Sequence, residues 1–246
     1  MSTLSQSAIA AIELICTPDP LLLGIVLRSL SVSATACLLA CAVGLPLGAW
    51  LGVARLRGRL AVLALLNTLL AVPSVVVGLI VYVLLSRSGP LGFLGWLFSF
   101  NAMVLAQALL VLPVVTALTC QVVADAENAH GEQLCSLGAR NGVRSLLLAW
   151  DERYALLTVV IAAFGRAISE VGAVMVVGGN IEGFTRVMTT AIALETSKGD
   201  LPLALGLGAV LLAVVLLLNA VVSSLRHWRE LAEGSQVHVA HWSGQS

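Results

Sequence analysis

Charged residues are scarce in this sequence. They make up 11% of its 246 residues, whereas hydrophobic residues make up 59% and the mean hydropathy is +1.01. A soluble globular domain carries about 25% charged residues, so the composition indicates a membrane protein. Lysine is almost missing, since Lys198 is the only one, and the formal net charge is zero. A neutral chain offers no basic surface to a nucleic acid, and we expect no such partner.

Motifs of enzymes and metal proteins are also missing. A phosphate-binding loop requires Gly-Lys followed by Ser or Thr, but Lys198 stands between Ser197 and Gly199. The chain therefore cannot hydrolyse ATP itself. No GxSxG motif occurs and all four histidines lie outside the long apolar segments, which argues against an intramembrane serine protease. We interpret His238 and His241 as solvated tail residues, and we expect neither a metal site nor a cofactor in this chain.

The cysteines show no pattern of a disulfide framework or a zinc site. They form no CxxC pair and stand at no zinc-ligand spacing from a histidine. We interpret them as free thiols that pack as small hydrophobic side chains. The five are Cys16, Cys37, Cys41, Cys120 and Cys135.

Long apolar segments dominate what is present. A helix needs about 20 residues to cross roughly 30 Å of hydrocarbon. Five segments reach that length, at about 29–53, 60–86, 96–122, 154–178 and 202–225. They predict an all-α polytopic membrane protein with about five transmembrane helices. Gly44 to Pro46 is expected to interrupt the first helix, and Pro73 and Pro113 are expected to bend the second and third. We identify no paired broken helices of the kind that secondary transporters use.

The flanking residues divide the chain into three parts. Residues 1–28 are expected to form a periplasmic segment, 29–225 the transmembrane domain, and 226–246 a disordered cytoplasmic tail. No cleavable signal peptide is evident, because the first positive charge is Arg28.

The basic residues predict the orientation. Loops on the cytoplasmic side of a membrane carry the excess of Lys and Arg. One side holds Arg55, Arg57, Arg59, Arg140, Arg144, Arg153, Arg226 and Arg229, and the other holds Arg28, Arg87, Arg186 and Lys198. This asymmetry places the C-terminus in the cytoplasm and the N-terminus outside.

A polar stretch at 125–152 interrupts the apolar sequence. It contains EQLCSLGAR at 132–140 and has apolar segments on both sides. Hydrocarbon cannot solvate it, because each buried polar group without a partner costs several kcal/mol. We therefore expect this stretch to lie in the cytoplasm as a helical docking surface for a soluble partner.

Part of this stretch resembles the EAA loop of ABC importer permeases. Glu132 begins the similarity, and Gly138 follows six residues later, as in that motif. The resemblance implies two short helices that sit in a cleft of the ATPase subunit, joined by a turn that the glycine permits. The residues expected to couple to the ATPase are Glu132, Gln133, Leu134, Leu137, Gly138 and Ala139. The sequence departs from the family where Gln133 and Leu134 replace two alanines and where 148–151 lacks the usual Ile-x-Leu-Pro.

A longer stretch, FGRAISEVGAVMVVGGNIEGFTRVMTTAIALETSKGD at 164–200, is similar to tungstate ABC-transporter permeases, a branch near the molybdate and sulfate permeases. Residues 67–92 and 106–115 also fit that branch. The resemblance implies a type I ABC importer permease core in a bacterial inner membrane. It implies a homodimer of this chain, two ABC ATPase subunits that bind ATP and Mg, and a periplasmic or extracellular oxyanion-binding protein. The alternatives are a molybdate or sulfate permease of the same class, or a gradient-driven secondary transporter.

Two charges inside the fourth apolar segment are candidate pathway residues. Arg166 and Glu170 lie four residues apart on one helical face. Each would cost about 2.5–3.5 kcal/mol at the bilayer centre, so we expect them to pair in the bundle interior. They form either a structural ion pair or part of an anion path. We favour the structural interpretation, because a carboxylate repels a dianion. Ser169 is a further candidate for the pathway or gate. We favour hydrogen bonds between helices over ligand binding for Ser169, Asn67 and Gln107.

The segment after this helix supplies further candidates. Gly178 to Asn180 is expected to end the helix, because Gly and Asn accept left-handed conformations. A short amphipathic helix should follow near the outer surface or pore mouth. Its hydroxyl and guanidinium groups could bind a tetrahedral oxyanion, or the segment is a solvated loop whose threonines cap and pack. The candidates here are Asn180, Thr185, Arg186, Thr189 and Thr190.

Overall fold

The structure is a computed structural model that describes residues 20–54, 58–217, 219–220 and 224. Every element in these ranges is helical, in agreement with the predicted fold class. In chain order the elements are α2 (Pro20–Val53), α3 (Arg59–Leu70), α4 (Ser74–Leu85), the 3-10 turn η1 (Gly92–Leu94), α5 (Phe100–Ser136), α6 (Asn141–Asp151), α7 (Arg153–Ile168), α8 (Gly172–Gly178) and α9 (Met188–Lys198), followed by the helix Leu201–Leu217. The predicted disordered tail at 226–246 lies outside the described residues, as does Cys16.

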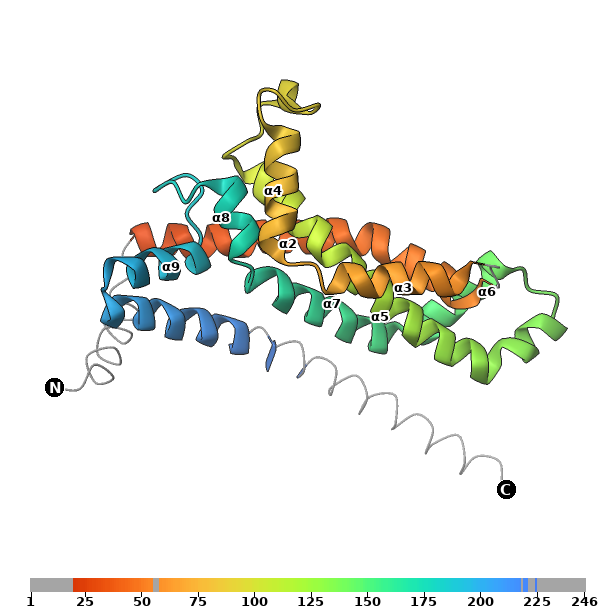
Figure 1. Ribbon diagram of the computed structural model, residues 1–246. Helices are drawn as coiled ribbons and strands as arrows, with labels where there is room; N and C mark the ends of the chain where they lie inside the picture. The colour runs from red at the N-terminus through yellow and green to blue at the C-terminus, as the bar shows by residue number, and fades with distance from the viewer. Residues whose placement is uncertain (1–19, 55–57, 218, 221–223, 225–246) are drawn as a thin grey trace, which may run out of the picture.

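An elongated bundle forms the body of the molecule, and α4 projects from it (Figure 1). Within the described residues, two helices are long and apolar enough to cross a membrane, and up to four spans result if each bent helix pair counts as one. The last helix bounded in the described residues, Leu201–Leu217, covers the fifth predicted span as far as residue 217. One apolar cluster packs α7 onto α2 and α5, and a second lies between α4, α5 and α8.

The two continuous spans, α2 and α5, both extend beyond their predicted limits. α2 begins at Pro20 instead of residue 29, and it passes Pro46 without a break, so the predicted interruption at Gly44 to Pro46 is wrong. A helix in hydrocarbon tolerates the loss of one hydrogen bond, because neighbouring helices cover the defect. α5 continues to Ser136 instead of ending near residue 122. Its last three turns are rich in Ala, Glu and Gln, which favour helix as well in water as in lipid.

A seam of small residues holds α2 against α5. Gly44, Gly48 and Gly52 recur every four residues along α2 and face α5. A Cβ atom added at Gly48 would lie 2.6 Å from the Thr116 carbonyl oxygen and 2.7 Å from Cβ of Thr119. The two backbones therefore approach as closely as they do in small-xxx-small packing of membrane helices.

The second and fourth predicted spans are broken helices. α3 and α4 meet at 95°, and α7 and α8 meet at 55°. With 12 residues, α3 is about 18 Å long at 1.5 Å per residue and covers only part of the hydrocarbon before α4 turns away. The predicted bend at Pro73 is thus present, whereas the expectation that paired broken helices are absent is wrong.

Different residues cause the two breaks. Pro73 prevents α3 from continuing into α4, because it lacks an N–H group and adopts the extended conformation that precedes α4. Between α7 and α8 there is no proline. There the Glu170 carboxylate accepts a hydrogen bond from the backbone N–H of Ala173 at 3.1 Å, which satisfies a free donor in the first turn of α8. At this break, the buried Glu170 carboxylate thus takes the place of the backbone carbonyl that would accept this N–H inside a continuous helix.

The two breaks lie side by side. A Cβ atom at Gly172, the first residue of α8, would be 2.9 Å from Ser74 Oγ at the start of α4. Further along, a Cβ atom at Gly78 would be 2.7 Å from Cα of Ala173. The half-helices α4 and α8 therefore pack directly on each other next to both breaks.

Candidate functional site

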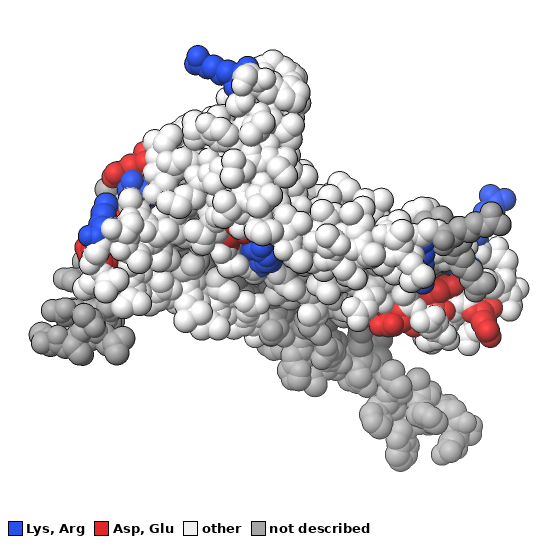
Figure 2. Space-filling view, viewed as in Figure 1, with Lys and Arg blue, Asp and Glu red and all other residues white. Residues whose placement is uncertain are grey.

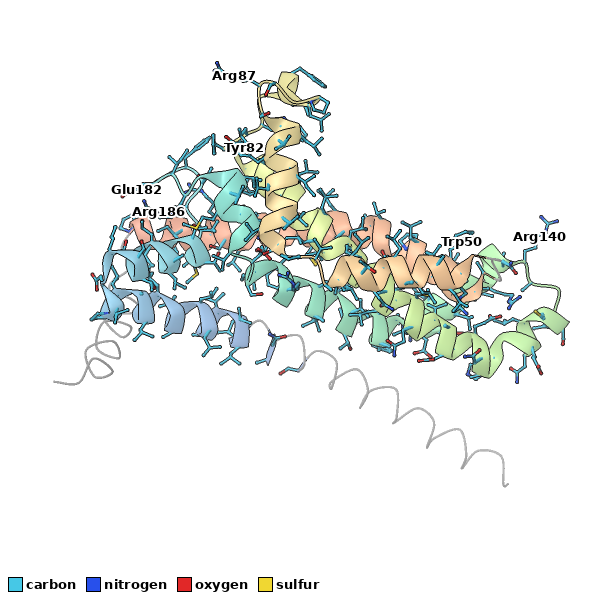
Figure 3. All side chains as sticks on the ribbon, viewed as in Figure 1. Trp50, Tyr82, Arg87, Arg140, Glu182 and Arg186 are labelled. Atoms are coloured by element: carbon cyan, nitrogen blue, oxygen red, sulfur yellow. The ribbon has the colours of Figure 1, made fainter. Side chains whose placement is uncertain are left out.

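Charged side chains gather toward the two ends of the elongated molecule and at the tip of the projecting arm, while most of the surface between them is uncharged (Figure 2). Figure 3 shows Arg140 and Trp50 at one end and Glu182 and Arg186 at the opposite end, with Arg87 at the tip beyond α4. The predicted cytoplasmic stretch and the predicted outer segment thus occupy opposite ends. An apolar body with two charged ends is the arrangement of a protein that crosses a bilayer.

The polar stretch 125–152 forms the end of α5, a tight turn and α6. Gly138 occupies the turn with φ +76°, and its N–H donates to the Cys135 carbonyl at 2.9 Å. The Ala139 N–H donates to the Leu134 carbonyl at 3.1 Å. These two bonds form a Schellman motif, in which the left-handed position favours glycine. The predicted turn is confirmed, but the first of the two expected short helices is the end of the 37-residue α5.

The structure brings the six predicted coupling residues together around this turn. Glu132, Gln133, Leu137 and Gly138 are exposed. Leu134 and Ala139 are partly buried, and Leu134 packs against the apolar cluster that includes Ala49 and Val53 at the end of α2. The turn is therefore convex and accessible, while its base rests on the membrane helices. Whether an ATPase subunit binds there stays a prediction.

α6 adds a surface that sequence reasoning missed. Its inner face buries Arg144, Ser145 and Leu148. Its outer face exposes four apolar side chains, Val143, Leu146, Leu147 and Trp150, whose exposed fractions are 51, 71, 43 and 69%. The spacing i, i+3, i+4, i+7 of these four residues is typical of one helix face and was visible in the sequence. A water-facing helix with its apolar side outward is incomplete without a partner.

The predicted ion pair inside the fourth span is present. Nη1 of Arg166 lies 2.7 Å from Oε2 of Glu170, which confirms the pairing, but Glu170 lies just beyond the end of α7 at Ile168 instead of on a helical face. Oε1 of Glu170 accepts the Ala173 N–H, and the Glu170 carbonyl accepts the Thr189 hydroxyl at 2.8 Å. The Glu170 side chain is 3% exposed, whereas that of Arg166 is 41% exposed. Glu170 thus links α7, α8 and α9, and Arg166 keeps part of its guanidinium accessible.

The outer segment has the predicted helix end and a later helix start. α8 ends at Gly178, and Gly179 and Asn180 adopt φ values of +69° and +50°. α9 begins at Met188, so Thr185 and Arg186 lie in the preceding loop instead of a helix. Nη1 of Arg186 pairs with Oε2 of Glu182 at 3.2 Å.

Hydroxyl groups of this segment are used inside the fold. Thr185 donates to the Gly178 carbonyl at 2.5 Å and accepts the Ile181 N–H at 2.9 Å. Thr190 donates to the Val187 carbonyl at 3.0 Å, and its own carbonyl lies 3.4 Å from Nδ2 of Asn180. Thr185, Thr189 and Thr190 are all buried. This arrangement favours the capping and packing interpretation, and the pathway role of these residues stays a prediction.

Of the other polar residues in the spans, Gln107 connects two helices. Its side-chain amide donates to the Ala167 carbonyl of α7 at 3.0 Å. Ser169 instead donates to the Arg166 carbonyl of its own helix at 3.2 Å, and Asn67 is exposed. Gln107 therefore behaves as expected, whereas Ser169 does not bridge helices.

Four of the cysteines are free thiols, in agreement with the sequence interpretation, and Cys16 lies outside the described residues. Sγ of Cys37 and Sγ of Cys41 lie 3.9 Å apart on α2. The described part of the chain contains no group of three His, Cys, Asp or Glu side chains that could hold a metal ion.

Fold and surface together define a multi-pass helical membrane protein with an incomplete water-facing end. No protein-family model matches the chain. It is 42% identical, over 92% of its length and 99% of the relative, to the tungstate uptake system permease protein TupB of Peptoclostridium acidaminophilum. It is 41% identical to a probable anion ABC transporter permease protein of Haloferax volcanii, over 83% of this chain and 90% of that one.

A second tungstate uptake system permease protein, from Campylobacter jejuni, is 40% identical over 66% of this chain and 68% of that protein. Sulfate and molybdenum transport permeases are similar at 32% and 29% identity. The chain therefore belongs to the family of ABC transporter permeases for tungstate and related anions.

Proposed function

We propose that this chain is the membrane subunit of an ATP-driven importer for a tetrahedral oxyanion, with tungstate as the substrate. It forms the translocation pathway, and a separate ATPase that binds ATP and Mg docks on its cytoplasmic end. The outer face of α6 supports this proposal most directly. Leu146 and Trp150 are 71% and 69% exposed on a helix at the polar end of the molecule. Apolar groups of this size gain free energy when a partner surface removes them from water.

The docking surface is wider than the EAA-like residues alone. Leu137, next to the turn at Gly138, adds a further apolar side chain that is 82% exposed. Exposed acidic and amide groups at Glu132 and Gln133 border this surface. A central apolar patch with a polar rim is the usual anatomy of a protein interface.

The pathway requires a second copy of this chain. α4 projects from the bundle (Figure 1), and five apolar side chains on it are between 45 and 57% exposed. They are Val75, Val76, Leu79, Ile80 and Val83. One bundle with a projecting apolar arm encloses little, whereas a two-fold pair lets each arm pack on the other copy. The transporter then has two permeases and two ATPases, with a periplasmic or extracellular oxyanion-binding protein at the outer end.

ATP changes the pathway through its unequal affinity for two states of the assembly. Binding of ATP draws the ATPase subunits together and moves the α6 ends, which opens the pathway toward the loaded binding protein. Hydrolysis restores the inward-facing state. In this cycle the N-terminus lies outside, the C-terminus lies in the cytoplasm, and the protein occupies the bacterial inner membrane. Arg166 is paired with Glu170 in a structural role, and its partly accessible guanidinium keeps it a candidate for the pathway.

Docking is tested by adding one negative charge on or off the apolar face of α6. Leu146→Asp places a carboxylate in the middle of the exposed face, whereas Gln121→Glu adds the same charge at an exposed position of α5. We expect Leu146→Asp to weaken binding of the cognate ATPase at least about tenfold and to abolish uptake. Gln121→Glu should retain both. Equal ATPase binding by the two variants would refute the docking assignment.

The substrate is tested by uptake into vesicles that contain the assembled transporter. We expect loaded binding protein to deliver tungstate, molybdate to compete with it, and sulfate to compete weakly. Binding calorimetry on the binding protein, with tungstate and molybdate in competition, assigns any preference to that partner. Uptake of sulfate in preference to tungstate, or uptake without ATP, would overturn the assignment.

A further inference from the structure

α6 is attached to the membrane helices by a buried ion pair. Arg144 lies on the inner face of α6, and its guanidinium pairs with the Glu127 carboxylate on α5. The two side chains are only 7 and 12% exposed. The Arg144 guanidinium also reaches Oδ1 of Asn141 at 3.4 Å, within α6 itself. The Glu127–Arg144 pair is thus a buried charged link between the docking helix and α5.

The pair sits where the helices leave little freedom. Leu148, one turn beyond Arg144, is 1% exposed in a cluster with Ala49, Val53, Val123 and Ala126. Gly131 lies one turn after Glu127, and a Cβ atom there would come within 2.6 Å of the Glu127 carboxyl group. The missing side chain at Gly131 therefore leaves the room in which Glu127 turns toward α6.

On the α5 side of the ion pair, the membrane helices are long and closely packed. Glu127 belongs to α5, a single helix from Phe100 to Ser136. Gly44, Gly48 and Gly52 hold α2 against that helix in backbone contact. A displacement of α6 that reaches Glu127 must move α5, and with it α2. Between α6 and α5, the contact that remains without the pair is the apolar cluster around Leu148, and apolar packing has no preferred direction.

We propose that Glu127 and Arg144 are the positioning pair that transmits ATPase movement from α6 to the membrane helices. This inference rests on the proposed function, since it assigns a role to the inner face of the same helix whose outer face docks the ATPase. It differs from docking in its expected defect. Variants of the pair should bind the ATPase normally and hydrolyse ATP, but the hydrolysis should move little substrate.

The first experiment measures uptake per ATP hydrolysed in vesicles that contain permease, ATPase and binding protein. Glu127→Gln and Arg144→Gln each remove one charge, and the double variant removes both. Asp125→Asn, an exposed position two residues before Glu127, is the matched control. We expect each pair variant to retain ATPase binding and to lower uptake per ATP at least about tenfold, within the range of coupling between sites. The double variant should be no worse than the poorer single variant, because the two residues act as one unit.

The second experiment restores the link by another bond. In a Cys135→Ser background, Glu127→Cys and Arg144→Cys are joined by a short bifunctional thiol reagent. Cys135 is removed because it is the exposed cysteine among those described. The unjoined variant should hydrolyse ATP with little uptake, and cross-linking should restore uptake per ATP. A reagent that reacts with each thiol singly should not.

Three results would overturn the inference. They are unchanged uptake per ATP after loss of the pair, loss of ATPase binding in parallel with uptake, and no gain of uptake on cross-linking. If ATPase binding and uptake are lost together, the pair stabilises the fold and does not transmit movement. A parent chain that binds no ATP-binding-cassette ATPase would contradict the proposed function itself, and this failure is separate because it appears before any substitution is made.

Discussion

The continuous helices and the broken ones have similarly apolar sequences but different packing. α2 and α5 run side by side in backbone contact at Gly44, Gly48 and Gly52. α3–α4 and α7–α8 instead bend by 95° and 55°, and their breaks meet around the buried carboxylate of Glu170. All of these helices are apolar, but small residues hold one pair together along its length, whereas Pro73 and the Glu170 carboxylate mark the breaks of the others.

The largest expected effect comes from filling the seam between the straight helices. In Gly48→Leu, even the first side-chain atom would lie 2.6 Å from a backbone oxygen of α5, so no rotamer relieves the contact. We expect a loss of about 3 kcal/mol in the free energy of unfolding, at the upper end of overpacking costs. The midpoint of denaturation in detergent measures it.

Gly24→Leu is the matched control for this substitution. Gly24 lies on the same helix, and no heavy atom comes within 4 Å of a Cβ atom built there. This variant should unfold close to the parent. If both leucine variants unfold at the same midpoint, the seam does not hold the two helices together.

A smaller and asymmetric effect is expected at the broken pairs. Arg166→Met leaves the Glu170 carboxylate, 3% exposed, without its cation, whereas Glu170→Gln leaves a guanidinium that is 41% exposed and can reach water. Loss of one partner from a fully buried pair costs about 3–5 kcal/mol. Because this pair is partly solvated, we expect about 2–3 kcal/mol for Arg166→Met and about 1 kcal/mol for Glu170→Gln.

The exposed pair of Lys198 and Glu195 serves as the reference for this comparison. Their side chains are 54 and 14% exposed, and such surface pairs contribute about 0–1 kcal/mol. Lys198→Met should therefore change the denaturation midpoint little. If Arg166→Met and Glu170→Gln lower the free energy of unfolding equally, burial of the Glu170 carboxylate does not determine how much this ion pair stabilises the fold.

The sequence predicts well what depends on composition or on a single local signal. The helical membrane fold, the pairing of Arg166 with Glu170, and the glycine turn at Gly138 all agree with the structure. In each case the sequence pattern is compatible with one local structure. Apolar length requires a helix, charges four residues apart lie close enough to pair, and a left-handed turn favours glycine.

What the sequence misses depends on contacts between distant segments. The bend at Glu170 has no proline, and there the carboxylate accepts a hydrogen bond from the backbone N–H of Ala173, next to α4. Conversely, Pro46 is a helix breaker by rule but lies inside an unbroken α2. The threonines at 185, 189 and 190 resemble anion ligands in sequence, yet their hydroxyls donate to carbonyl groups of the fold. Local propensity cannot reveal these partners, because tertiary packing chooses them.

A local effect of about the same size as that of Glu170→Gln is expected at the end of the straight pair, where α5 turns into α6. Gly138→Ala forces a side chain into φ +76°, a conformation that costs about 1–2 kcal/mol for a residue with a Cβ atom. No neighbour lies within 4 Å of that Cβ atom, so the cost is one of backbone strain alone. Gly142→Ala is the matched control, because Gly142 is helical and equally uncrowded, and alanine there should be neutral or slightly stabilising. The strain falls on the turn that presents Leu137, so we expect Gly138→Ala to weaken ATPase binding several-fold, as measured by titration of the ATPase onto the purified permease. If both alanine variants bind the ATPase equally, the turn is not part of the docking geometry, and the straight pair ends in a surface whose shape α6 alone determines.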